Sequence, residues 1–469
     1  MKDTSNKINW ICWQVGIICF SLSVFFTEFS YQTGNFTSRL MVTRAIVENG
    51  SIDITPYQEY LTVDQSHFQS KVYSDKPIGS SLLMVIPYFI IEHILNGWEL
   101  RYISEAFSLL LKAWVAEIFS LCLLSACFMV IFTRMCIVYL NVSKSKMLLI
   151  SFAYFGSLIF PYSTIGMGEN YVLLFLVLSA YYLLKTPSST KYIILSSLWL
   201  LISIQIYYQV AILVFPWGLY LLLAERSKFI LWSVGIIVAL FLVLLYNRIF
   251  FGGWFHFAYN YCIAFSTMGL QNNWEWVGLN KFYQVTISPW RGILFYMPVL
   301  ILLFQSSLWV ERIKKYSSLI WTGPILMFYL YLLFYKEWDG GSCFGLRYIV
   351  PALPFAYAII IGYLSKIKWN ILHYTLVSYT LSISILGTIT DPHVERSFQN
   401  PVIDFCFPYL LQQGPNNILV DFNRHLSGYH HIAFSYLTLL IPLSFVVILY
   451  MRKKNLKHDA YPKQKQTDS

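Results

Sequence analysis

Apolar runs alternate with short polar gaps along almost the whole chain, from Trp10 to Tyr450. An α-helix needs about 20 apolar residues to cross a bilayer, and many of the runs approach or exceed that length. The pattern therefore predicts an all-α polytopic membrane protein with about 11–14 helices. The predicted spans lie at roughly 10–27, 79–95, 106–139, 147–162, 169–184, 191–206, 207–223, 229–250, 292–309, 318–335, 349–365, 370–388 and 431–450.

The start of this list leaves two questions. The run Trp10–Phe26 has the length of a signal peptide, but no small-residue cleavage site follows it, so we predict a retained first helix. The number of predicted spans is odd, whereas a chain with both ends in the cytoplasm needs an even number. Either Ser80–Leu95 lies along the membrane surface, or the long run Ala106–Leu140 is a broken pair of helices. The sequence leaves both alternatives open.

Composition excludes a soluble protein, because 57% of the residues are hydrophobic and only 12% are charged, against roughly 25% charged in a soluble domain. The predicted architecture is a single membrane domain over residues 1–450, followed by a basic cytoplasmic tail over 451–469. A net charge of +10 could indicate nucleic-acid binding, but no basic stripe of that kind is present. We therefore predict contact with membrane lipids and no nucleic-acid partner.

The basic residues cluster at alternate gaps between the apolar runs, which is the positive-inside pattern of cytoplasmic loops. The clusters are Lys144 and Lys146; Lys185 and Lys191; Arg226 and Lys228; Arg312, Lys314 and Lys315; Lys366 and Lys368; and Arg452, Lys453, Lys454 and Lys457. The gaps 30–78, 251–290, 336–348 and 391–431 mix acids and bases and are predicted to face outward.

The first outward loop, residues 30–78, is dense in charge and partly helical by its pattern. Thr37–Asn49 reads as an amphipathic helix that stops at Asn49-Gly50. Such a helix would lie on the outer membrane surface, with Arg39 and Arg44 near lipid headgroups or an anionic lipid-borne ligand. The alternative is a solvated, interfacial charged loop without a ligand.

An acid, a base and a proline, Asp75-Lys76-Pro77, stand where the chain re-enters the bilayer. Glycosyl transfer from a lipid phosphate needs a carboxylate to deprotonate the acceptor and a cation to stabilise the leaving phosphate. Asp64 and Asp75 are the candidates for the carboxylate. The candidates for the cation are Lys76, Arg39 and Arg347.

Short motifs in a fixed order carry a resemblance to a known family. They are Asn35-x-x-x-Arg39 with Arg44–Gly50, Thr62-Val63-Asp64, Tyr73–Gly79, Ser288–Pro298, and Glu337–Tyr348 followed by Pro351–Phe355. The set resembles bacterial GT-C glycosyltransferases, whose general plan protein O-mannosyltransferases and lipid A aminoarabinose transferases share. The resemblance implies a GT-C type transmembrane bundle in the bacterial cytoplasmic membrane. It also implies sugar transfer from a polyprenyl-phosphate donor to an extracytoplasmic glycan, lipid or protein.

The chain departs from the family pattern just after the first helix. Many GT-C members place an Asp or an Asp-Glu pair there, whereas this sequence has Gln32–Ser38, so Glu28, Asp64 or Asp75 must supply the base. Lys76 follows Asp75 directly and is predicted to depress its pKa, whereas Asp64 has no adjacent cation. We therefore predict Asp64 as the base, with Asp75 and Lys76 as a positioning pair; the alternative is that Asp64 only caps a turn.

The predicted substrate-binding residues come from the same motifs. They are Arg39, Arg44, Tyr73, Arg291, Glu337, Arg347 and Tyr348. The sequence does not define metal ligands, and it leaves open whether a divalent metal ion is needed.

Charged residues within or beside apolar runs are costly and indicate either function or pairing. These are Lys112, Glu117, Glu169 and Arg248. Two other classes of function fit the hydropathy: a flippase or transporter of lipid-linked sugars, and a polysaccharide polymerase or ligase. The acid-rich first loop favours the transferase, since a flippase should line its membrane interior with polar groups and a polymerase usually has its largest loop later in the chain.

Overall fold

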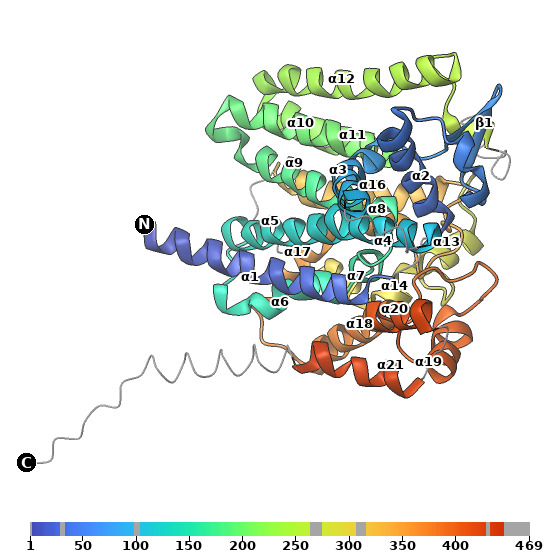
Figure 1. Ribbon diagram of the computed structural model, residues 1–469. Helices are drawn as coiled ribbons and strands as arrows, with labels where there is room; N and C mark the ends of the chain where they lie inside the picture. The colour runs from blue at the N-terminus through green and yellow to red at the C-terminus, as the bar shows by residue number, and fades with distance from the viewer. Residues whose placement is uncertain are drawn as a thin grey trace, which may run out of the picture.

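The computed structural model describes residues 2–28, 33–97, 104–262, 274–305, 316–427 and 432–444. Within them the chain is a helical bundle with one two-stranded sheet, which confirms the predicted all-α class (Figure 1). Six of the described helices are long and apolar enough to cross a membrane, as a multi-pass membrane protein requires. They span Ile8–Phe26, Glu105–Tyr139, Gly168–Ser188, Arg226–Phe251, Arg347–Leu364 and Ile371–Ile389.

The individual elements divide these spans more finely. The first half contains α1 (Lys2–Phe26), α2 (Gly34–Asn49), η1 (Thr55–Tyr60), β1 (Gln65–Phe68), β2 (Lys71–Ser74), α3 (Ile78–Gly97), α4 (Glu105–Glu117), η2 (Ile118–Cys122), α5 (Leu123–Tyr139), η3 (Lys144–Lys146), α6 (Met147–Phe155), α7 (Ile159–Tyr162), α8 (Gly168–Tyr171), α9 (Leu173–Lys185), η4 (Thr186–Ser188), α10 (Thr190–Ile206), η5 (Tyr208–Leu213) and α11 (Val214–Ala224). The second half contains α12 (Arg226–Phe251), η6 (Ala258–Tyr261), α13 (Leu279–Thr286), α14 (Ile293–Tyr296), η8 (Pro298–Ile301), α16 (Ser318–Phe334), η9 (Arg347–Ala352), α17 (Leu353–Leu364), α18 (Ile371–Ile389), η10 (Pro401–Cys406), α19 (Phe407–Gln413), α20 (Ile418–Ser427) and α21 (Ile432–Thr438).

The bundle is built by apolar helices that pack side by side. The predicted first helix, α1, lies along α5, while α10 packs against both α9 and α12, and α16 lies between α11 and α17. One hydrophobic core runs through these helices and includes the fully buried rings of Trp217, Trp232 and Trp321. A second core cluster holds α2 against α3 and α4.

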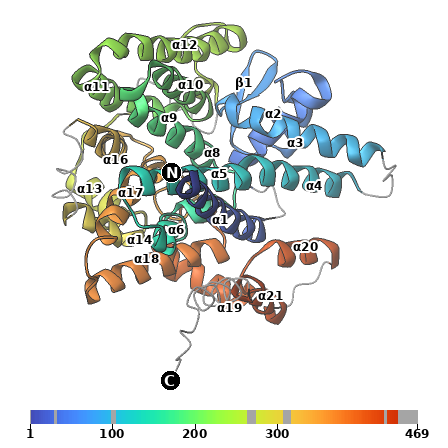
Figure 2. The same ribbon diagram turned by 90° about the vertical axis from the view of Figure 1, so that its left-hand side faces the viewer.

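The structure clarifies the odd number of predicted spans. Figure 1 looks nearly along α3, whereas α1 and α5 lie lengthwise across the same view. Figure 2, turned by 90°, shows α3 and α4 lengthwise and side by side. The long run Glu105–Tyr139 is one helix interrupted by a π-helical segment at Ile118–Cys122, a common site of bending, and not a separated pair. α3 therefore runs across the direction of α1 and α5, and whether it crosses a bilayer stays a prediction.

Two predicted spans do not form single helices. The span predicted at 147–162 divides into α6 and α7 around Gly156, whose backbone N–H donates to Phe152 O. The span predicted at 292–309 contains only the short α14 and η8, followed by a helical stretch that is described to residue 305. Proline at 298 removes a backbone donor there and begins a new turn. The predicted tail, 451–469, lies outside the described residues.

The loops that were predicted to face outward gather at one end of the bundle. In Figure 1, α2, β1, α13, α19 and α20 lie at the right-hand end and the N-terminus at the other. The hairpin β1–β2 pairs Gln65 with Ser74, and Ser66 forms a bridge to Cys262, so the first loop is tied to the chain after α12. The grouping agrees with the charge pattern; which side of a membrane this end faces stays a prediction.

Candidate functional site

Helix α2 brings the first predicted residues into the protein interior. Thr33 caps its start by accepting a hydrogen bond from Phe36 N, and Gly50 ends it in the left-handed region (φ 61°). Ten of its 16 residues are buried, including Arg39. The predicted helix is therefore confirmed, but it is wedged between other elements and buries more than one face, whereas an amphipathic surface helix would bury one. Its position relative to the membrane stays a prediction.

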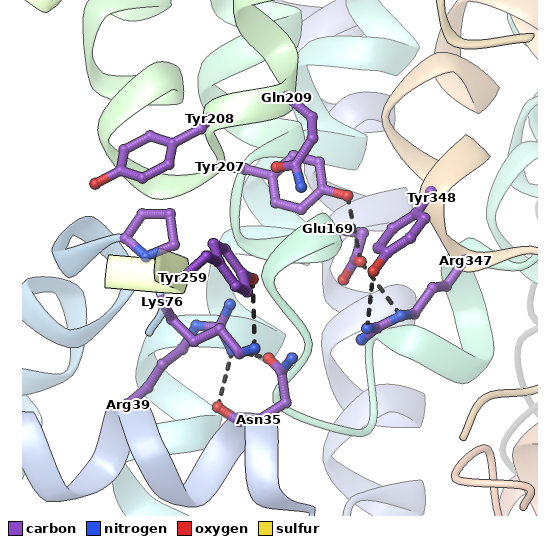
Figure 3. Close-up of a pocket in the computed structure, with 11 residues that line it drawn as sticks. Asn35, Arg39, Lys76, Glu169, Tyr207, Tyr208, Gln209, Tyr259, Arg347 and Tyr348 are labelled. Atoms are coloured by element: carbon purple, nitrogen blue, oxygen red, sulfur yellow. Dashed lines mark hydrogen bonds and ion pairs between the residues drawn. The ribbon is translucent and has the colours of Figure 1, made fainter. Parts of the chain in front are cut away.

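A pocket opens beside α2 at the loop end of the bundle (Figure 3). Its volume is about 30 Å³, which is room for about two water molecules, so in this structure the pocket is narrow. Its charged lining consists of three cations and one carboxylate: Arg39, Lys76, Arg347 and Glu169. The polar and aromatic lining includes Asn35, Tyr207, Tyr208, Gln209, Tyr259 and Tyr348.

Lys76 forms the centre of one wall of the pocket. Its Nζ lies 2.8 Å from Asp64 Oδ1 and 2.8 Å from Asp75 Oδ2, and all three side chains are buried. The chain turns at Asp75-Lys76 between β2 and α3, and β1 follows directly after Asp64, so the hairpin brings the two acids to one amine. Lys76 also donates to Tyr259 Oη at 3.4 Å. The ammonium group is thus partly neutralised where it meets the pocket.

The pKa values of Asp64 and Asp75 differ from those expected from the sequence. Burial raises the pKa of Asp64, but the charge and hydrogen bond of Lys76 outweigh it and hold this pKa below the usual value. Burial and the nearby charge of Asp64 raise the pKa of Asp75 to about 6, although Lys76 opposes them. The predicted order of the two pKa values was therefore wrong, because the fold places Lys76 against both carboxylates and not only against its sequence neighbour.

Arg39 forms the floor of the pocket in Figure 3. Its Nε donates to Ser80 Oγ at 2.7 Å, and its Nη1 donates to Asn35 O at 2.8 Å and also contacts Asn35 Oδ1. A Cβ at Gly168 would lie 2.6 Å from Arg39 Nη2, so a larger residue at this position of α8 would displace the end of the Arg39 side chain. These contacts fix Arg39 with one face toward the pocket.

The opposite wall holds an acid that the sequence analysis did not assign to the site. Glu169 is 2% exposed, and its Oε1 lies 3.6 Å from Arg347 Nε and accepts a 3.4 Å hydrogen bond from Tyr207 Oη. Its Oε2 has no hydrogen-bond partner among the described residues. The available signal was a charged residue at the edge of an apolar run, which indicates function or pairing but not which.

Arg347 and Tyr348 come from the start of η9 and line the pocket together. Arg347 Nη1 lies 3.0 Å from Met167 Sδ, and Nη2 donates to Tyr348 Oη at 3.4 Å. Both residues are buried. Figure 3 shows this pair with Glu169 facing Lys76 and Arg39 across the pocket.

Four other predicted substrate-binding residues lie away from the pocket lining. Arg44 donates to both carboxylate oxygens of Glu48 at 3.0 Å and lies over the Tyr57 ring, so it connects α2 to η1. Tyr73 packs its ring against Phe251, with the ring centroids 5.4 Å apart.

Arg291 and Glu337 complete that group. Arg291 is fully buried and donates to Gly341 O at 3.0 Å. Glu337 Oε2 lies 3.8 Å from Arg396 Nη2. Arg291 therefore contacts the loop that leads to Arg347, and Glu337 belongs to that loop; neither residue lines the pocket.

The remaining acidic candidate, Glu28, belongs to a separate polar group. Asn416 Nδ2 donates to its Oε1 at 3.5 Å. Burial and the nearby charges of Asp391 and Asp421 raise the pKa of Glu28. No group of three or more His, Cys, Asp and Glu residues arranged to hold a metal ion is found in the part of the chain that the structure describes.

No model of a known protein family matches the sequence, and no curated protein matches it at a significant level. The resemblance to GT-C enzymes therefore depends on the short motifs. Of these motifs, the ones around Arg39, Lys76 and Arg347 contribute lining residues to a single pocket. Such a pocket, with three cations around a small polar space, is suited to an anionic group such as a phosphate.

Proposed function

We propose that this protein is a membrane glycosyltransferase of the GT-C type that uses a polyprenyl-phosphate sugar donor. The observation that carries the proposal is the convergence of Arg39, Lys76 and Arg347 on one pocket that also holds the carboxylate of Glu169. Sugar transfer from a lipid phosphate leaves negative charge on the departing phosphate, and fixed cations stabilise that charge. The pocket is lined in part by α2, and Figure 1 shows α2 at the end of the bundle where the loops predicted to face outward gather.

In this proposal the two arginines and Lys76 receive the donor phosphate. Arginine offers a planar fork that matches phosphate oxygens, while the ammonium group acts as a point charge. Asp64 and Asp75 hold Lys76 in place through its two 2.8 Å contacts. The tyrosines of the lining supply ring faces for the sugar and hydroxyl groups for its polar edge.

Two carboxylates are candidates for the base that takes the acceptor proton. Asp64 is the residue that the sequence analysis predicts, yet its low pKa makes it a weaker proton acceptor. Glu169 is the acid in the pocket lining, and its Oε2 is free of hydrogen bonds within the described residues. We therefore propose Glu169 beside Asp64 as a candidate for the base, and the experiment below tests both residues.

The decisive experiment uses purified protein in lipid nanodiscs, incubated with a panel of radiolabelled polyprenyl-phosphate sugars. Release of free polyprenyl phosphate together with a labelled acceptor supports the proposal. Binding of the donor without release, or movement of the intact donor across a vesicle membrane, would replace it with the flippase alternative. Arg39→Gln should abolish donor binding, while Arg44→Gln, on the same helix but outside the pocket, is the matched control.

The base is assigned by a second comparison in the same assay. Asp64→Asn and Glu169→Gln each keep the shape of the side chain and remove its basicity. We expect the variant that lacks the base to bind donor normally and to lose most of its turnover, by about 10²–10⁴-fold for general-base catalysis. Native turnover in either variant would remove that residue from the role.

A further inference from the structure

Two consecutive glycines precede Arg347 in the loop that follows α16. Gly340 and Gly341 both adopt left-handed backbone conformations, with φ of 76° and 72°. A Cβ added to Gly340 would lie 2.9 Å from Arg347 Nε and 3.0 Å from its Cγ, whereas one added to Gly341 would meet nothing within 4 Å. The backbone at Gly340 is therefore in direct contact with the Arg347 side chain.

The Gly340–Gly341 turn is fixed by groups from other parts of the chain. The fully buried Arg291 donates to Gly341 O at 3.0 Å from the segment before α14. Gly341 N donates to Asp339 Oδ1 at 3.1 Å, and Arg396 Nε, in the loop after α18, lies 2.5 Å from Asp339 Oδ2. The Gly340–Gly341 turn is thus held from both sides by Arg291 and Arg396, each about 50 residues away in the sequence.

Arg347 itself has few strong partners. Its polar contacts include a methionine sulfur at 3.0 Å, a tyrosine hydroxyl at 3.4 Å and a carboxylate oxygen at 3.6 Å from Nε, and its guanidinium lies 5.0 Å from the centroid of the Tyr348 ring. Its Nε has no hydrogen-bond partner among the described residues. Packing against the Gly340 backbone is therefore a principal constraint on where the guanidinium points.

We propose that the Gly340–Gly341 turn, clamped by Arg291 and Arg396, is a positioning device that aims Arg347 into the pocket. The inference rests on the proposed function only for the identity of the ligand, a lipid phosphate. It assigns Gly340, Arg291 and Arg396 as positioning residues, which act through Arg347 and do not touch the ligand. It also explains why a fully buried arginine follows Ser288-Pro289-Trp290 in the sequence.

The two glycines provide a matched pair of variants. Gly340→Ala and Gly341→Ala impose a similar backbone strain, since both positions have positive φ, but only the first adds a methyl group against Arg347. The readout is the rate at which phenylglyoxal modifies Arg347 in the full-length protein without ligand, measured by mass spectrometry of the peptide. We expect Gly340→Ala to change this rate by roughly tenfold and Gly341→Ala to leave it near the wild-type value, because displacements of about 1 Å matter for positioned groups. Equal rates in all three proteins would overturn the inference.

A second variant and a second readout complete the test. The Arg396 side chain is 58% exposed, so Arg396→Gln is expected to fold, and it should shift the Arg347 modification rate in the same direction as Gly340→Ala. If Gly340→Ala does not fold, an unchanged rate in Arg396→Gln overturns the proposal. Affinity for undecaprenyl phosphate, measured in nanodiscs, should weaken in parallel with the altered rate. If the rates change as expected but no form binds the lipid phosphate, the positioning inference stands and the proposed function fails.

Discussion

The contact of Lys76 with both Asp64 and Asp75 leads to a prediction about the stability of variants at the two acids. Lys76 Nζ is 2.8 Å from both Asp64 and Asp75, yet the two carboxyl groups differ in how the fold treats their charge. The pKa of Asp64 is lowered, so its ionised form stabilises the native state. The pKa of Asp75 is raised by burial and by the charge of Asp64, so its ionised form destabilises the native state. Substituting each by asparagine should therefore have opposite effects near neutral pH.

The size of the effect at Asp75 follows from its pKa. A rise from 3.8 to about 6 corresponds to about 3 kcal/mol, at about 1.36 kcal/mol for each pKa unit. Because the pKa is raised, protonated Asp75 contributes this free energy to the stability of the wild type in full below pH 3.8. The contribution is lost as the pH rises to about 6. Asp75→Asn should thus stabilise the protein by up to about 3 kcal/mol at about pH 8, less the value of the hydrogen bond to Lys76. At about pH 4 the benefit should vanish.

Asp64→Asn should behave in the opposite way. The contribution of Asp64 is present above its ordinary pKa and is lost as the pH falls through the lowered value. The variant should be less stable than wild type at about pH 8, with a deficit that shrinks in acid. Unfolding by SDS titration, followed by tryptophan fluorescence at several pH values, measures both variants. Equal destabilisation by the two substitutions at about pH 8, or a difference that does not depend on pH, would refute the reasoning.

Three further predictions concern stability away from the pocket. Arg44→Ala should cost about 1–3 kcal/mol by removing a charged hydrogen-bond donor, while lipid-phosphate binding is retained; loss of binding in a folded variant would place Arg44 in the site. Gly79→Ala should destabilise by about 1–3 kcal/mol, because the new Cβ would lie 2.5 Å from Gln205 O; an unchanged SDS midpoint would contradict the packing. Lys112→Met should destabilise by about 1–3 kcal/mol at neutral pH by removing the charge that pairs with Glu92, and the double variant with Glu92→Leu should recover part of the loss; no recovery would mean that this ion pair is not the cause.

Several features could be predicted from the sequence because they depend only on local chemistry. Runs of apolar residues indicate which segments lie in the membrane. Those segments form helices, because the backbone there must satisfy its own hydrogen bonds. The helix ending at Asn49-Gly50 was predicted from the freedom of glycine to adopt positive φ, and Gly50 has φ 61°. The motifs around Arg39, Lys76 and Arg347 were selected by residue type and spacing, and all three residues line the pocket.

The tertiary structure alone decided which of these groups meet. The sequence pattern predicts that α2 is helical but not how much of it is buried. The helix was predicted to bury one face, and most of its residues are buried. The sequence predicts that Lys76 acts on its neighbour Asp75. The hairpin also brings Lys76 into contact with Asp64, 12 residues earlier. Glu169 and Arg347 are far apart in the chain, and their contact exists because α8 packs against η9. Electrostatic energy falls with distance in space and not with separation along the chain, and only the folded bundle defines those distances.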